Sequence, residues 1–470
     1  MARSCRQVVT RVFDPDGALC GGRFTAGVPR TVVASLGVAA VAAVVFASAA
    51  RLPFISDDYS YLETVRQPGW WHARAIWDPG GAPFTQLYRP FLFVWFGVLY
   101  HLFGLHPLVF HVATGVLVAI GAVMTALVGR RLGLHSGAYV AGVVYCLHAS
   151  MAVPVGWTSA ASSPLATALA LGAVYVLLRP RLRAREVAAA SILFVVALMT
   201  REVVALTPAV VFISVYIVDG GRPWRQRIRR SLVVSSPLWL ALLAYAAVRR
   251  SSGFDSTLGP YQQRIGSQAF SNLWRLMQYA TEFGQSTHLG GLVAAFWLLL
   301  IGLCIYAAVH SQLPQGLIGL GWAFLGVLPV IFLARHRMEY FYVGFALPGI
   351  AIAVGTVFQS VLATSAKNVR WAAATVLVAV LATLGFYAAR QAERPYLDRS
   401  ARRYSAVIDY VRRHNPHPAK GSTIRLPITA KQAVFGSYLQ LVRVVFDDSS
   451  LQVAYKPSHP MNREMTRPQA

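Results

Sequence analysis

Long apolar segments constrain the fold of this sequence more than any other feature. Runs of roughly 18 or more apolar residues recur along most of its 470 residues, and about 20 such residues cross a bilayer as a helix. Only 13% of the residues are charged, whereas a soluble domain carries about 25%. The sequence therefore predicts an all-α polytopic membrane protein, surrounded by a lipid bilayer.

The apolar runs predict about eleven transmembrane helices. They cover residues 31–50, 107–129, 136–153, 161–178, 187–200, 203–218, 231–248, 288–309, 315–333, 341–362 and 371–390. The two runs between 187 and 218 share one apolar stretch interrupted by Arg201 and Glu202, so one long bent helix would also fit. Segment 90–104 is short and aromatic, which favours a helix that lies in the membrane interface.

The positive charges orient these helices. The net charge of +25 comes from Lys and Arg residues grouped in short loops between apolar runs, a pattern typical of membrane topology and not of nucleic-acid binding. With an interfacial segment 90–104, the richest basic loops share one side with the N-terminal tail. These loops are 130–131, 179–185, 222–230 and 367–370. We therefore expect a plasma or inner membrane protein with a cytoplasmic N-terminus and an extracytoplasmic C-terminus.

Three regions follow from this topology. Residues 1–30 form a basic cytoplasmic tail, and residues 31–390 form the membrane domain, with long outer loops at 51–106 and 249–287. Residues 391–470 change character: YSAVIDYVRRH has helical periodicity, and STIRLPIT, VRVVFDD and LQVAYK have the patterns of strands. We expect a small extracytoplasmic α/β cap in this last region.

Two adjacent carboxylates, Asp57 and Asp58 in FISDDYSYL, follow the first predicted span. Carboxylates are costly near lipid, so such a pair is a candidate functional site. A carboxylate of this kind accepts a proton from a hydroxyl group during catalysis. The competing interpretation is structural, because Asp is a favoured N-cap for a helix that begins near Tyr59.

Further polar residues are predicted on the same outer face. These are Tyr88, Arg89, Arg201, Glu202, Arg337 and Tyr340. An arginine binds a phosphate group through two parallel hydrogen bonds and stabilises it as a leaving group. Structural alternatives remain open: Arg201 and Glu202 could form an ion pair at a helix break, and Arg337 could anchor the interface. The four cysteines lack metal-site spacing, and no metal site is predicted.

Several segments together resemble the GT-C superfamily of membrane glycosyltransferases. In order along residues 31–362 these are FISDDYSYL, YRPFLFVWFGVLYHLFGLHPLVFHV, VGRRLG, CLHASMAVPVGW, ALMTREVVALTP and RMEYFYVGF. The pattern is most similar to the protein O-mannosyltransferase-like branch, which includes the tetratricopeptide-linked mannosyltransferases. The tetratricopeptide repeats are absent here, and Ala161 and Ser163 stand where that branch has Arg and Asp.

The resemblance implies a hexosyl or pentosyl transferase that moves a sugar, with inversion, from a polyprenyl-phosphate carrier to an extracytoplasmic acceptor. The acceptor would be a protein, a glycolipid or a polysaccharide of the cell envelope. It implies Asp57 as the base with Asp58 as its competitor, and Glu202 as a residue that orients Arg201 or contacts the sugar. The carrier phosphate would be bound by Arg89, Arg201 and Arg337. A divalent metal cofactor is left open by the resemblance.

Two other classes of function fit the same composition. A carrier or flippase of lipid-linked glycans would require inverted repeats or matching broken helices in two halves, and the sequence has no convincing internal symmetry. A non-catalytic assembly protein on the same fold would fit the missing Arg and Asp near Ala161 and Ser163.

The predicted topology is tested by labelling. A single cysteine introduced between positions 55 and 60 is expected to react with a membrane-impermeant thiol reagent added outside intact cells. Reaction only after the cytoplasm is opened would reverse the topology and remove the basis of the transferase interpretation.

Overall fold

A computed structural model provides the structure of the chain. It describes residues 37, 40–41, 44–72, 74–78, 88–251, 262–281, 290–311, 313–334, 338–364, 366–392, 395–429, 433 and 437–456. Half of the predicted first span 31–50 therefore lies outside the described residues, as does Arg337.

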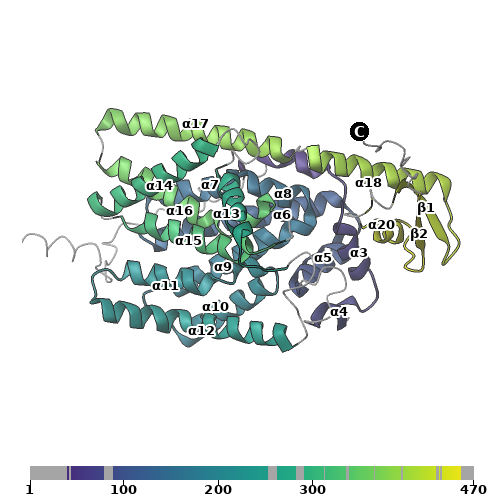
Figure 1. The fold of residues 1–470 in the computed structure, drawn as a ribbon, viewed down its shortest axis with the longest axis horizontal. Coiled ribbons are helices and arrows are strands. Elements are labelled where there is room, and N and C mark those ends of the chain that lie inside the picture. Colours follow the sequence, from purple (N-terminus) through teal and green to yellow (C-terminus); the bar gives the residue numbers. More distant parts are fainter. Residues whose placement is uncertain are drawn as a thin grey trace, which may run out of the picture. The chain divides into compact units, whose positions relative to one another are not determined.

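Helices occupy each of the ten predicted spans that follow the first, and two consecutive helices share the span 136–153. They are α6 (Pro107–Arg131), α7 (Ser136–Leu147), α8 (Ala152–Gly156), α9 (Ser162–Leu177), α10 (Ala184–Leu198), α11 (Thr207–Val218), α12 (Trp224–Ser251), α14 (Gly290–His310), α15 (Gln315–Ile331), α16 (Leu347–Thr364) and α17 (Lys367–Ala392). Many of them run side by side as a bundle (Figure 1).

Five helices in the described part of the chain are long and apolar enough to cross a membrane, or six if the bent pair α7 and α8 counts as one span. The predicted total of about eleven spans therefore remains a prediction. Helices α10 and α11 are separate, joined through the 3-10 helix η5 (Glu202–Val204), so the alternative of one long bent helix is wrong.

Segment 90–104 forms the helix α5 (Pro90–Phe103), which begins with a proline in its first turn and ends at Gly104 with φ 67°. Proline suits the first turn of a helix, and glycine accepts this left-handed backbone at its end. Fourteen residues rise about 21 Å, less than the roughly 30 Å thickness of the hydrocarbon core. Its length thus favours the interfacial position.

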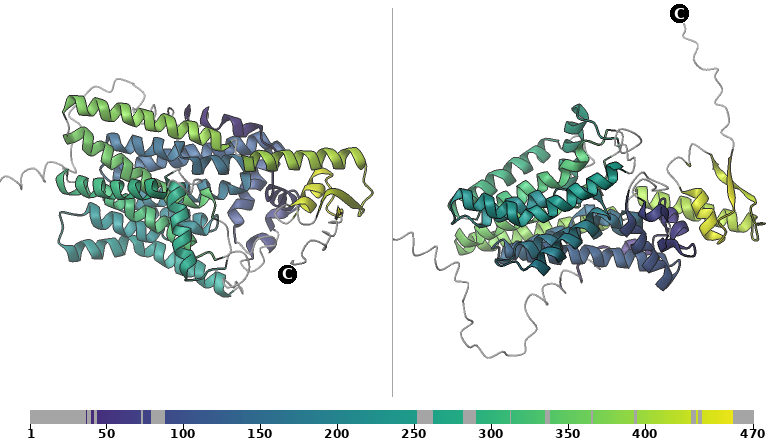
Figure 2. Two further views of the ribbon diagram at one scale, coloured as in Figure 1. Left: turned by 45° about the horizontal axis from the view of Figure 1, so that its top comes forward. Right: turned by 90° about the horizontal axis from the view of Figure 1, so that it is seen from below.

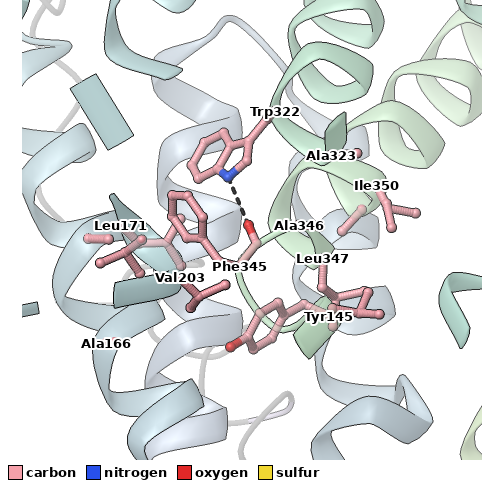
Figure 3. Close-up of a cluster of buried hydrophobic side chains, with 14 of the residues drawn as sticks. Tyr145, Ala166, Leu171, Val203, Trp322, Ala323, Phe345, Ala346, Leu347 and Ile350 are labelled. Carbon is pink, nitrogen blue, oxygen red and sulfur yellow. Dashed lines mark hydrogen bonds between the residues drawn. The ribbon is translucent and has the colours of Figure 1, made fainter. Parts of the chain in front are cut away.

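The main hydrophobic core lies between the bundle helices. Trp322 of α15 is fully buried, and its indole Nε1–H donates to the Phe345 carbonyl over 2.9 Å. Figure 3 shows this pair surrounded by side chains from several helices, including Leu171 of α9 and Ile350 of α16. The hydrogen bond satisfies the indole N–H in an apolar interior, where an unpaired donor would be costly.

Glycines allow two of these helices to approach closely. A Cβ atom placed on Gly355 of α16 would collide with the backbone carbonyl of Gly137 in α7. Backbone contact of this kind is typical of helix pairs in membranes, where small residues let van der Waals packing replace the hydrophobic effect.

The C-terminal region contains α18 (Pro395–His414), β1 (Thr423–Thr429), α20 (Tyr438–Val445) and β2 (Gln452–Lys456). The two strands pair in parallel, with Thr423 opposite Gln452. The predicted helix and two of the predicted strands are present. The strand predicted from VRVVFDD is wrong, because Tyr438, Leu441 and Val442 follow the three- and four-residue spacing of a helix and bury one face of α20.

These C-terminal elements share a second hydrophobic core with the segment predicted as the first outer loop. The described part of this segment contains α3 (Asp58–Val65), η2 (Trp70–His72) and α4 (Arg74–Trp77), and η1 (Ala47–Arg51) leads into it. Buried residues of α18, β1 and α20 pack with those of α3 and α5, and Figure 2 shows them next to this loop. That they form a separate extracytoplasmic domain remains a prediction.

The close contact of α7 and α16 predicts that Gly355→Ala destabilises the protein. The added methyl group has no space, so the two helices must move apart. Gly302→Ala in α14 is the matched control, because nothing lies within 4 Å of a Cβ there and alanine favours a helix by about 1 kcal/mol. Thermal unfolding in detergent should show a lower midpoint for Gly355→Ala alone; equal midpoints would contradict the close contact.

Candidate active site

Asp58 is a fully buried carboxylate that accepts three hydrogen bonds from the protein. Its Oδ2 accepts from the Ile55 backbone N–H over 3.0 Å, and its Oδ1 accepts from the Ser159 backbone N–H over 2.7 Å and from the Ser159 hydroxyl. Burial raises the pKa of Asp58 to about 6, although these hydrogen bonds oppose the shift. Asp58 thereby joins the start of α3 to the 3-10 helix η4 (Thr158–Ala161).

Asp57 differs from its neighbour although the chemistry of the two side chains is the same. It occupies the N-cap position of α3, but its side chain makes no capping hydrogen bond. The interpretation of Asp57 as a helix cap is therefore correct for its position at the start of α3, but the expected capping hydrogen bond is not formed. As a whole residue Asp57 is half-buried, whereas Asp58 is fully buried, and the Ser56 hydroxyl lies 3.5 Å from Asp57 Oδ1.

The turn that presents Asp57 has an unusual backbone. Ser56 has a φ of 50°, in the left-handed region that non-glycine residues seldom adopt. Backbone strain of this kind often marks functional sites. Here it lies directly before the two carboxylates, in the turn that leads into α3.

The electrostatic surroundings of Asp57 favour a base near neutral pH. Burial, and then the adjacent charge of Asp58, raise the pKa of Asp57 to about 6, while Ser56 and Arg89 lower it. A carboxylate with this pKa is charged at pH 7 and accepts a proton more readily than an unperturbed Asp.

Arg89 links the acidic turn to the junction between α10 and α11. Its Nε lies 3.6 Å from Oε2 of Glu202, and the Phe91 N–H donates to the Met199 carbonyl over 3.4 Å. The predicted ion pair between Arg201 and Glu202 is therefore replaced by one between Arg89 and Glu202, which brings together residues more than 100 positions apart.

Arg201 lies in a different environment from Glu202. Its side chain is buried, and its Nη1 donates to the Ser162 hydroxyl over 2.9 Å. The guanidinium lies over the Phe341 ring at 4.6 Å and over the Tyr342 ring at 5.0 Å, both in the 3-10 helix η7 (Tyr340–Val343). The contacts with aromatic rings stabilise its charge in a partly apolar setting.

Tyr340 is buried at the start of the same 3-10 helix, where its ring packs on Tyr279 with a centroid distance of 4.1 Å. Tyr279 belongs to α13 (Ser267–Ala280), a helix within the segment predicted as outer loop 249–287. The predicted residues thus fall into two groups: Asp57, Arg89 and Glu202 in one, and Arg201 with the η7 aromatics in the other. Consecutive residues 201 and 202 connect the groups.

Tyr88 lies near two residues, Tyr245 and Arg249, that the sequence analysis did not select as candidate site residues. Its hydroxyl donates to the Trp77 carbonyl over 3.3 Å, and its ring lies 5.7 Å from the Arg249 guanidinium and 6.3 Å from the Tyr245 ring. Tyr245 in turn interacts electrostatically with Glu202 and Arg89. Arg249 is buried at the end of the apolar helix α12, and a buried arginine in that position is the signal that could have identified this group.

The serine-rich turn TSAASSP supplies anchoring groups to both parts of the site. Ser159 binds Asp58 and Ser162 binds Arg201, while the Ser163 hydroxyl donates to the Phe341 carbonyl over 2.9 Å. This turn is where the sequence departs from the mannosyltransferase pattern, and its small hydroxyls hold neighbouring segments in place. Among the described residues, no group of three His, Cys, Asp or Glu side chains is arranged to hold a metal ion.

An apolar cavity of about 210 Å³ lies under α13, between α14 and α15. Its lining includes Leu273, Met277, Trp297, Leu320, Phe324 and Val343. Asn272 secures α13 there, since its Nδ2 donates to the Ile331 and Leu333 carbonyls over 2.9 and 2.8 Å. Val343 connects the cavity to the 3-10 helix whose aromatics contact Arg201.

Comparison with solved structures identifies the fold. The structure is similar to ArnT from Cupriavidus metallidurans, which was solved bound to undecaprenyl phosphate, with a TM-score of 0.54 and 15% sequence identity over 91% of this chain and 86% of that chain. It is also similar to the apo oligosaccharyltransferase of Archaeoglobus fulgidus, with a TM-score of 0.55 and 10% identity over 90% of this chain and 64% of that chain. This chain therefore spans less than two thirds of the length of the archaeal enzyme.

These structural likenesses confirm the predicted GT-C-type fold. No protein-family model matches the sequence, and no curated protein sequence is significantly similar to it. The O-mannosyltransferase-like branch remains a prediction.

The different environments of the two carboxylates predict different effects on stability. Asp58→Asn should destabilise the protein by about 1–3 kcal/mol, because an amide cannot accept at both oxygen positions and buried N–H donors lose their partners. Asp57→Asn should leave the unfolding midpoint in detergent nearly unchanged. Equal losses for both variants would contradict the assignment of Asp58 as the structural carboxylate.

Proposed function

We propose that this protein is an inverting membrane glycosyltransferase that uses a polyprenyl-phosphate-linked sugar. The observation that carries the proposal is the half-buried Asp57, which lies beside the Arg89–Glu202 pair and is adjacent to a carboxylate that already accepts hydrogen bonds from the protein. A base next to guanidinium groups is the arrangement needed to activate a hydroxyl acceptor and to release a phosphate.

The reaction is a single displacement at the anomeric carbon. Asp57 accepts the proton of the acceptor hydroxyl as the acceptor oxygen bonds to the anomeric carbon. The bond from that carbon to the phosphate oxygen breaks on the opposite face of the sugar, and polyprenyl phosphate leaves with the electron pair. Attack from the face opposite the leaving group inverts the configuration. The charge that develops on the phosphate is then stabilised by arginine.

The described arginines that can bind the carrier phosphate are Arg89, Arg201 and Arg249. Tyr88 lies against Arg249, and Tyr340 lies in the 3-10 helix that contacts Arg201, so both tyrosines belong to the proposed substrate site. Glu202 orients Arg89 through their ion pair, in place of the role toward Arg201 that the resemblance implies. Arg337 lies outside the described residues and stays a sequence-based candidate.

The apolar cavity is the proposed seat of the first isoprene units of the carrier. Its lining is almost wholly hydrocarbon, and Val343 at its edge belongs to the same short helix as the Arg201 contacts. A lipid phosphate is amphipathic, so an apolar cavity that shares η7 with the contacts of the buried Arg201 guanidinium suits both of its ends. The similarity to a protein solved with undecaprenyl phosphate supports this class of donor.

The predicted topology assigns the acceptor side. With the N-terminus in the cytoplasm of a plasma or inner membrane, Asp57 faces the extracytoplasmic side, where the acceptor would be a protein, a glycolipid or a polysaccharide. The C-terminal region would lie on that side as well, packed on the first outer loop.

The proposal is tested with purified protein and a panel of polyprenyl-phosphate sugars. Release of polyprenyl phosphate should require an acceptor and should fall at least about 100-fold in Asp57→Asn, as expected for loss of a general base. Asp398→Asn is the control, because Asp398 forms an exposed ion pair with Arg402 in α18. Unchanged release by Asp57→Asn would exclude Asp57 as the base.

The rate should also depend on pH in one direction. Because Asp57 must be charged to accept a proton and its pKa is raised to about 6, transfer should be full above this pH and be lost as the pH falls through it. A steady-state profile from pH 4.5 to 8 checks this expectation, in which an unperturbed Asp would place the loss near pH 4. A rate independent of pH over this range would count against a base whose pKa is raised to about 6.

A further inference from the structure

Helix α13 (Ser267–Ala280) runs across the bundle and not along it. Figure 1 shows α13 at a steep angle to the long helices α12 and α14, and the left view of Figure 2 agrees. A helix that crosses a membrane runs alongside the other spanning helices, whereas an amphipathic helix in the membrane interface lies in the plane of the bilayer. The direction of α13 therefore favours a position at the membrane surface.

Contacts place α13 at the ends of two apolar helices. Asn272 donates to the carbonyls of Ile331 and Leu333, where α15 ends. Trp274 lies at the start of α14, because a Cβ atom placed on Gly290, the first residue of that helix, would be 3.5 Å from the indole ring. Helix α14 is long and apolar enough to cross a membrane. Helix α13 therefore lies at the level where a spanning helix begins.

The bundle covers only part of the apolar surface of α13. Leu276 and Ala280 on its inner side are buried. Phe270 and Trp274, which are one helical turn apart, are 78% and 37% exposed, and Ile265 just before the helix is 88% exposed. These three side chains form an exposed apolar strip.

Polar side chains occupy the next sector of the same helix. Gln268, Ser271 and Arg275 are exposed. At about 100° of rotation per residue, Ser271 and Arg275 are turned by about 100° from Phe270 and Trp274. The apolar strip thus lies between the side that packs on the bundle and a polar side. A helix with Trp and Phe on one face and Arg on the other is typical of the membrane interface.

The strip is continuous with a surface that faces lipid. Leu292, Leu298 and Leu299 of α14 are 54%, 71% and 63% exposed, and exposed leucines on a spanning helix contact acyl chains. Trp274 contacts the first residue of this helix, two positions before Leu292. The lipid-facing surface of α14 therefore extends onto α13 at the boundary of the bilayer, where tryptophan is enriched in membrane proteins.

We propose that α13 is an interfacial helix that docks on the outer leaflet of the membrane. Phe270 and Trp274 insert between the phospholipid headgroups and the first carbons of the acyl chains, while Arg275 stays among the headgroups. This docking does not depend on the proposed glycosyl transfer. Because Leu273 and Met277 of the same helix line the apolar cavity, it also fixes that side of the cavity near the depth of the headgroups.

Photocrosslinking of the full-length protein tests the docking. The photoreactive residue p-benzoylphenylalanine replaces Phe270, and on irradiation its ketone carbon bonds to a neighbouring C–H group. Ser271, the next residue and on the polar side, is the matched control position, and Leu298 of α14 is the positive control. All three side chains are exposed, and unfolding midpoints establish that each variant is folded. The proteins are irradiated in nanodiscs of phosphatidylcholine and phosphatidylglycerol, and adducts are identified by mass spectrometry.

Position 270 should form phospholipid adducts on acyl carbons close to the ester groups. Position 271 should form at least about fivefold fewer, because the polar side of an interfacial helix faces water. Leu298 follows Gly290 by eight residues in α14, which is about 12 Å along the helix, so its adducts should lie farther along the acyl chains. The same photoreactive residue at position 274 should repeat the result of position 270.

Three results would overturn the docking of α13 on lipid. They are equal lipid labelling at positions 270 and 271, lipid adducts at position 298 but none at 270, and crosslinks from position 270 to a second copy of the chain or to another protein in place of lipid. None of these readouts involves sugar transfer, so the docking and the proposed transferase stand or fall separately.

Discussion

The site depends on one buried interaction, the set of hydrogen bonds that Asp58 accepts from Ile55 and Ser159. A buried carboxylate is tolerated only when its lone pairs are satisfied. Because Asp58 accepts three hydrogen bonds from the protein, it fastens α3 to the serine-rich turn before α9. The carboxylate next to it is then left at the edge of the same junction, half-buried and with its pKa raised to about 6. One aspartate holds the structure, and its neighbour is available for chemistry.

The charged side chains of Glu202 and Arg201 also have partners that lie far away in the sequence. Glu202 pairs with Arg89, while Arg201 lies between the Ser162 hydroxyl and two aromatic rings. The hydroxyls of one short turn thus connect the acidic loop, the α10–α11 junction and η7. The apolar cavity continues from η7 into the bundle. An amphipathic lipid phosphate is the class of ligand that fits arginines at one end and an apolar cavity at the other.

Sequence reasoning predicted what depends on local pattern. Hydropathy and length identify the helices of the ten later predicted spans, because a long apolar run is a contiguous property of the chain. They do not identify α13, which lies in the segment predicted as a loop. It failed for VRVVFDD, where an apolar run too short to distinguish a strand from a helix is helical in α20. It could not separate Asp57 from Asp58, since the decisive partner, Ser159, is about a hundred residues away. Tyr245 and Arg249 were missed for the same reason: their places in the site come from tertiary contacts.

The most direct test is an electron cryo-microscopy structure of the protein with a bound polyprenyl-phosphate sugar. The account predicts that the phosphate lies within hydrogen-bond distance of Arg89, Arg201 or Arg249. It also predicts that the Asp57 carboxylate faces the anomeric carbon while Asp58 stays bound to Ser159. A phosphate bound among the arginines at 222–230, or a sugar facing Asp58 released from Ser159, would contradict it.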